Sequence, residues 1–133
     1  MNRKIGIWLD NKNAYFIQVM EAKTKVEALQ STVEDFHPGG GATSKTPWGP
    51  QDSMKEKKYL ERKKQQLQRY FQAIINKLQA EDDLYIFGPA EAKLGLKKAI
   101  ENHRQLPLNL LAVETADQMT PNQKIAQVKA FFS

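Results

Sequence analysis

Positive charge is concentrated in one short stretch of this sequence. The chain has 133 residues, with 20 Lys and Arg against 15 Asp and Glu and a net charge of +5. Residues 55–69 hold seven cations and two carboxylates, so this stretch alone accounts for the net charge. The cations are Lys55, Lys57, Lys58, Arg62, Lys63, Lys64 and Arg69. Such a cluster is typical of proteins that bind the phosphate backbone of a nucleic acid; the alternative is a solvated helix of mixed charge.

A segment rich in glycine and proline directly precedes these cations. Residues 37–51 contain four of the seven glycines and three of the six prolines. Glycine lets the backbone approach a ligand closely, and proline blocks pairing into a sheet. We therefore predict a flexible loop at about 37–52, and a loop of this length inside a compact domain usually has a function. Its candidate ligand-binding residues are His37, Gly39, Gly40, Gly41, Trp48 and Gly49.

The composition argues against several kinds of site: disulfides, metal centres, two-metal nucleases and phosphate-binding P-loops. Cysteine is absent, which excludes disulfides and thiolate metal sites, and the two histidines are a weak basis for a metal centre. A two-metal nuclease needs several converging carboxylates, but Asp10 is the one acid expected at a suitable strand end, and a turn explains it more simply. The glycines also lack the Lys-Ser or Lys-Thr of a phosphate-binding P-loop. We expect neither a metal nor a cofactor.

The hydrophobic pattern predicts five strands and three helices. Segments 4–10, 14–20 and 26–33 have the composition of an antiparallel meander joined by polar turns. Segments 83–87 and 107–113 are short apolar runs typical of buried parallel strands. Helical patterns cover about 53–79, where Asp52 or Ser53 can cap the helix, 90–103 and the region from Pro121 onward. The order β-β-β-α-β-α-β-α predicts one α/β domain over 1–133, a mixed five-stranded sheet with helices on its faces, similar to ribonuclease-H-like and ribosomal L18/S11-like domains.

The long helix expected at 53–79 has two unlike halves. Its second half carries an apolar stripe at spacings of three and four, formed by Leu67, Tyr70, Phe71, Ile74, Ile75 and Leu78. We expect this half to dock on the sheet, and the basic half before it to be solvated and to project from the domain. The strand at 26–33 is expected at an edge, where a second copy could pair with it, so both a monomer and a homodimer remain open.

The sequence gives no sign of a membrane segment. The apolar runs are far shorter than the roughly 20 residues that cross a bilayer. No apolar stretch of signal-peptide length follows the first four residues. We therefore expect a cytoplasmic protein.

Three features, in this order along the chain, resemble a known family. They are His37-Pro38-Gly39-Gly40-Gly41, the basic stretch 55–69, and Tyr85-Ile86-Phe87-Gly88-Pro89-Ala90-Glu91-Ala92-Lys93. Together they resemble the middle domain of eukaryotic and archaeal class-1 peptide-chain release factors and its single-domain bacterial relatives. In that family a Gly-Gly-Gln loop reaches the peptidyl-transferase centre, where the glutamine helps to place the water that hydrolyses peptidyl-tRNA.

The present sequence departs from the family at the glutamine. Ala42 follows the glycines, and Gln51, within Gly49-Pro50-Gln51, is a second candidate for that position. The resemblance thus implies Gln51 as the candidate catalytic residue and residues 55–69 as the RNA-binding surface.

Two functions follow from these observations. The first is a translation-associated, RNA-binding module that contacts ribosomal RNA or tRNA, with hydrolysis of peptidyl-tRNA as one branch. The alternative is a protein-interaction domain that uses the loop and Trp48 and has no catalytic activity.

Overall fold

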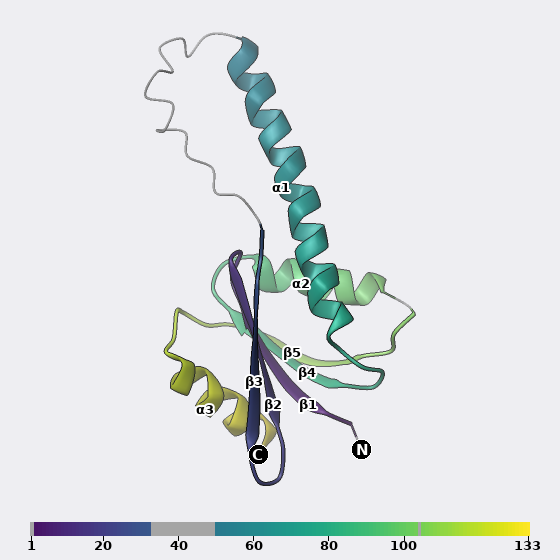
Figure 1. The fold of residues 1–133 in the computed structure, drawn as a ribbon, viewed down its shortest axis with the longest axis vertical. Helices are drawn as coiled ribbons and strands as arrows, with labels where there is room; N and C mark the ends of the chain where they lie inside the picture. The colour runs from purple at the N-terminus through teal and green to yellow at the C-terminus, as the bar shows by residue number, and fades with distance from the viewer. Residues whose placement is uncertain (1, 33–49, 104) are drawn as a thin grey trace.

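The computed structural model describes residues 2–32, 50–103 and 105–133 (Figure 1). For residues 50–55 it describes the backbone alone. The described residues form eight elements, in the predicted order. The strands are β1 (Lys4–Leu9), β2 (Asn13–Val19), β3 (Thr24–Gln30), β4 (Asp83–Gly88) and β5 (Asn109–Thr115). The helices are α1 (Pro50–Asn76), α2 (Ala92–Asn102) and α3 (Pro121–Phe132). None of these helices is both long and apolar enough to cross a membrane.

The five strands form one mixed sheet in the order β3-β2-β1-β4-β5. β1 pairs antiparallel with β2, and β2 with β3, which confirms the predicted meander. β1 pairs parallel with β4, and β4 with β5, as the helical crossovers require. The central strands β1 and β4 are buried along nearly their whole length, because helices cover both faces there. β3 lies at an edge, as expected, and is mostly exposed.

Each face of the sheet has its own apolar core. Ile5, Ile7 and Leu9 point to the side covered by α1 and α2, whereas Trp8 points to the side covered by α3. This alternation follows from the two-residue repeat of a strand. At Gly6 the third helix lies directly on β1: an added Cβ would come within 2.2 Å of Cγ2 of Val128. Only glycine leaves room for this approach.

The start of α1 corrects the predicted loop boundary. The helix begins at Pro50 rather than at Asp52 or Ser53, so the last three residues of the predicted loop at 37–52 are helical. The missing N–H and restricted φ of proline are compatible with the first turn of a helix, which explains the earlier start. Gln51 therefore lies in the first turn of α1 and not in a loop. Residues 37–49 lie outside the described residues.

Candidate nucleic-acid interface

The two halves of α1 have different surroundings, as predicted. In the second half, Tyr70, Phe71, Ile74 and Ile75 are buried in the core beneath the helix, and Leu67 packs against them from its margin. The hydroxyl of Tyr70 donates a hydrogen bond of 2.9 Å to the backbone carbonyl of Asp10 at the end of β1. The first half extends beyond the sheet (Figure 1). The apolar stripe thus fixes one end of a helix whose other end projects from the domain.

The cations lie along the projecting half of α1, and Arg69 extends the series into the docked half. Lys57, Lys58, Arg62, Lys64 and Arg69 are exposed, and Lys63 is half-buried. Lys55 is helical, but its side chain is outside the described residues. Spacings of four and seven residues put Lys58, Arg62 and Arg69 on one side of the helix, opposite the buried stripe. We call these three residues the outer face of α1.

Lys63 and Lys64 have a different position. Spacings of three, four and seven residues from Leu67 and Phe71 put them on the same side of the helix as the buried stripe, one turn before it. Both line hollows between α1 and α2. The six described cations of the basic stretch therefore do not form one surface, which the count of charges alone could not show.

The carboxylates near the ends of the parallel strands are already engaged. Oδ1 of Asp10 accepts hydrogen bonds from the backbone N–H groups of Lys12 and Asn13, at 2.8 and 2.7 Å, and Oδ2 accepts one from Gln118 at 3.2 Å. Asp82 is buried and forms an ion pair with Arg3, at 2.7 Å between the guanidinium and Oδ2. This geometry supports the interpretation of Asp10 as a turn residue.

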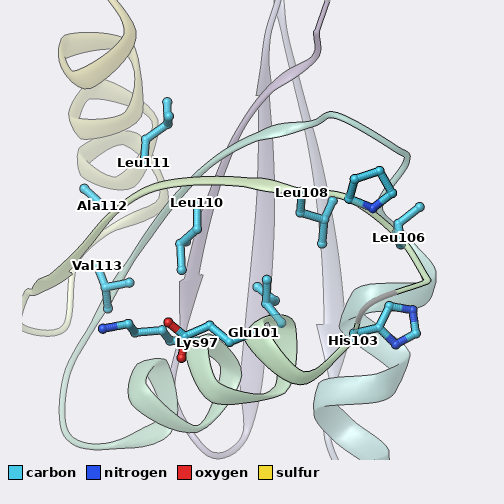
Figure 2. A pocket seen from close by; sticks show the side chains of 11 residues that line it. Lys97, Glu101, His103, Leu106, Leu108, Leu110, Leu111, Ala112 and Val113 are labelled. Atoms are coloured by element: carbon cyan, nitrogen blue, oxygen red, sulfur yellow. The ribbon is translucent and has the colours of Figure 1, made fainter.

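A separate hollow, of about 520 Å³, lies between α2 and the edge strand β5. Figure 2 shows Leu110 and Val113 directed toward α2, with Lys97, Glu101 and His103 along the helix side. Its rim therefore carries a cation and an anion together. A rim of mixed charge provides no preference for phosphate, in contrast to the outer face of α1.

Sequence inspection missed a buried cation on the opposite side of the sheet. Nζ of Lys124, on α3, lies 4.0 Å from the ring centroid of Trp8 and 3.8 Å from that of Tyr15. Lys124 is only 5% exposed, and burial lowers its pKa, while the nearby Asp10 carboxylate acts in the opposite direction. Trp8 and Tyr15 are register partners on β1 and β2, so the two rings form one aromatic platform. This contact fixes α3 against the sheet.

The other predicted site residues are not brought together by the described part of the chain. His37, Gly39, Gly40, Gly41, Trp48 and Gly49 all lie outside it. Gln51 is placed only by its backbone, in the first turn of α1.

Comparison with known proteins gives only distant likenesses. No protein-family model and no curated protein matches the sequence. The crystal structure of the archaeal translation termination factor aRF1 is similar with a TM-score of 0.35 and 13% identity, covering 96% of this chain and 38% of the other. A Ppx/GppA family member from Aquifex aeolicus is similar with a TM-score of 0.30 and 14% identity, covering 92% of this chain and 36% of the other. The chain thus spans less than two-fifths of the length of either protein.

Proposed function

We propose that this protein binds RNA of the translation apparatus, ribosomal RNA or tRNA, through α1. The observation that supports the proposal is the line of exposed cations on a helix that projects from its domain (Figure 1). The choice of translation RNA follows from the sequence resemblance to release-factor middle domains.

The dimensions of the outer face suit a phosphate backbone. At a rise of about 1.5 Å per residue, the distance along the axis from Lys58 to Arg69 is about 16 Å. That length faces several successive phosphates of one strand. Because the outer face points away from the core, phosphates can reach these cations without any change in the fold.

The test compares two variants that remove the same number of charges. The outer-face variant is Lys58→Gln with Arg69→Gln, and the control is Lys4→Gln with Lys129→Gln, whose side chains are exposed on β1 and α3. Binding of tRNA and of ribosomal subunits is measured over a series of salt concentrations. We expect wild type and control to bind with a steep salt dependence. The outer-face variant should bind more weakly, and its slope of log K against log salt should be smaller by about 1.4 if two single-strand phosphate contacts are lost.

Either of two results would contradict the proposal. Wild type without affinity at low salt, where phosphate contacts are strongest, would exclude RNA binding. Equal losses in the outer-face variant and the control would show that total charge matters and α1 does not. The protein-interaction hypothesis would then become the better one.

Hydrolysis of peptidyl-tRNA is a separate step of this proposal and depends on Gln51. Gln51→Ala is compared with wild type for release of the peptide from peptidyl-tRNA on ribosomes. Loss of release with unchanged RNA affinity would support a role for Gln51 in positioning water. Release that is absent from wild type would leave RNA binding as the whole function.

A further inference from the structure

The helices α1 and α2 approach each other closely at Gly95. An added Cβ at this glycine would lie 2.6 Å from Cε2 of Phe71, so a larger residue would force the ring or the helix to move. Two adjoining hollows, of about 400 and 390 Å³, meet at this contact and have Leu67, Phe71, Gly95 and Lys98 in common. We call the two hollows together the α1–α2 groove.

The groove has an apolar floor and a cationic rim. Leu67, Phe71 and Ile75 of α1 form the floor, and the exposed Leu94 extends it on the α2 side. Lys63, Lys64 and Lys98 line the rim, where Glu91 is the one carboxylate among the residues that the structure describes. None of these three lysines forms an ion pair with another described residue. The amides of Gln68, Gln72 and Asn102 lie along the same groove.

This combination is chemically different from the outer face of α1. Cations alone attract phosphates of any nucleic acid. An apolar floor between cations, with amides beside it, suits a nucleotide whose base has left its stack: the base covers the floor, the amides meet its polar edge, and the neighbouring phosphates meet the lysines. Bases inside a duplex are already stacked and paired, so they cannot enter such a hollow.

We propose that the α1–α2 groove binds an unstacked nucleotide of single-stranded RNA, with Lys64 and Lys98 on its flanking phosphates. The inference rests on the proposed function and adds to it the class of RNA and a second helix. Lys98 and Leu94 thereby become binding residues, although the sequence predicts Leu94 on the buried face of its helix and the structure exposes 53% of it. Lys64 connects the groove to the basic half of α1, so a strand can pass from one surface to the other.

The experiment uses two labelled probes and variants matched in charge. The probes are a short oligouridylate and a blunt RNA duplex of the same length. The groove variant is Lys64→Gln with Lys98→Gln, and it is compared with the outer-face variant, the Lys4→Gln/Lys129→Gln control and wild type. We expect the groove variant to lose about tenfold in affinity for oligouridylate and much less for the duplex. The outer-face variant should lose affinity for both probes alike.

A further variant separates the floor from the rim. Leu94→Ser removes an exposed apolar side chain and no charge. We expect it to weaken oligouridylate binding severalfold while leaving the salt dependence unchanged, because no phosphate contact is lost.

Four results would overturn the inference. If the groove variant binds oligouridylate as the control does, while the outer-face variant is impaired, the groove is wrong and the proposed function stands. If the groove variant loses equal affinity for both probes, the lysines contact phosphates without selecting a single strand. If oligoglutamate displaces oligouridylate as well as unlabelled oligouridylate does, the groove takes an acidic peptide. If wild type binds neither probe, the inference fails together with the proposed function.

Discussion

Tyr85 shows how one buried polar side chain links the sheet to α3. Its hydroxyl is 2.6 Å from Oε1 of Glu114 on β5 and accepts a hydrogen bond of 2.9 Å from Gln127 on α3. Its ring stacks on Phe131 with the centroids 4.1 Å apart. Burial, and next the hydrogen bond to Glu114, raise the pKa of Tyr85 to about 12. The hydroxyl therefore keeps its proton in the folded protein at a pH where an unfolded tyrosine has lost it.

This shift predicts a loss of stability at high pH. Because the folded-state pKa lies above the unfolded value of about 10, the contribution of Tyr85 is complete below pH 10 and disappears as the pH rises toward about 12. Urea unfolding of wild type and Tyr85→Phe between pH 9 and pH 12 measures it. The free energy of unfolding should fall less steeply in the variant. Burial also raises the pKa of Tyr70, so this residue adds its own pH dependence. Tyr70→Phe is therefore measured in the same way, to separate the two contributions. Parallel curves for wild type and Tyr85→Phe would contradict the prediction.

At the scale of residues, the sequence predicted local roles well and distant partners poorly. Asp10 was assigned to a turn because turn composition is local, and its carboxylate does bind the turn amides. The position of Lys124 over Trp8 and Tyr15 could not be found, because more than one hundred positions separate it from those rings along the chain. A lysine in an amphipathic helix normally predicts a solvent-facing side chain.

The docking of α3 depends on the small size of one residue in β1. With Gly6→Ala, the new Cβ would come within 2.2 Å of Cγ2 of Val128, a fully buried side chain. We expect Gly6→Ala to lower the free energy of unfolding by about 1–3 kcal/mol, the usual range for overpacking. Urea unfolding with analysis of the midpoint and slope measures this change.

A double-mutant cycle with Val128→Ala distinguishes a steric cause from a general effect. Val128→Ala alone should be destabilising because it leaves a cavity. Combined with Gly6→Ala it should be less destabilising than the sum, because the new methyl fills the vacated space. Strict additivity would show that Gly6 acts through the backbone of β1 and not through α3.

At the scale of elements, the type and order were predictable and the boundaries were less so. Strand-forming composition, polar turns and short apolar runs predicted the strands, and spacings of three and four residues predicted the helices. The start of α1 was placed too late because Asp52 and Ser53 are good capping residues, whereas Pro50 is the first residue of the helix. Helical spacing alone separates the outer face from Lys63 and Lys64, but the groove that these two lysines line required the position of α2, which no periodicity supplies.

On the scale of the whole molecule, the cations of the basic stretch and the apolar cores that stabilise the fold lie in different parts. The cores lie on the two faces of the sheet, while most described cations of the basic stretch are exposed on α1. In the part of α1 from Lys57 to Gln66, Tyr59 is buried, but Leu60 is 54% exposed and most of the other side chains are exposed too. This segment therefore has less tertiary packing than the half around Tyr70 and Ile74, and helices depend on such packing for most of their stability.

Hydrogen exchange should reveal this division along α1. In the free protein, we expect backbone amides of the projecting half to exchange much faster than those around Tyr70 and Ile74, which are anchored in the core. When tRNA is bound, protection should increase in the projecting half and change little in the docked half. Uniform protection along α1 in the free protein would contradict the expected difference. Protection by RNA confined to other elements would contradict binding through α1.

The continuity of α1 has a mechanical consequence. The helix has 27 residues without an interruption, which corresponds to about 40 Å at a rise of about 1.5 Å per residue. The helix is anchored in the core by its second half, from Tyr70 to Leu78, so its direction is fixed by that packing. A ligand bound to the projecting first half is therefore held at a distance from the sheet that the length of the helix sets. The described parts of the edge strands β3 and β5 belong to the sheet and not to this projecting half.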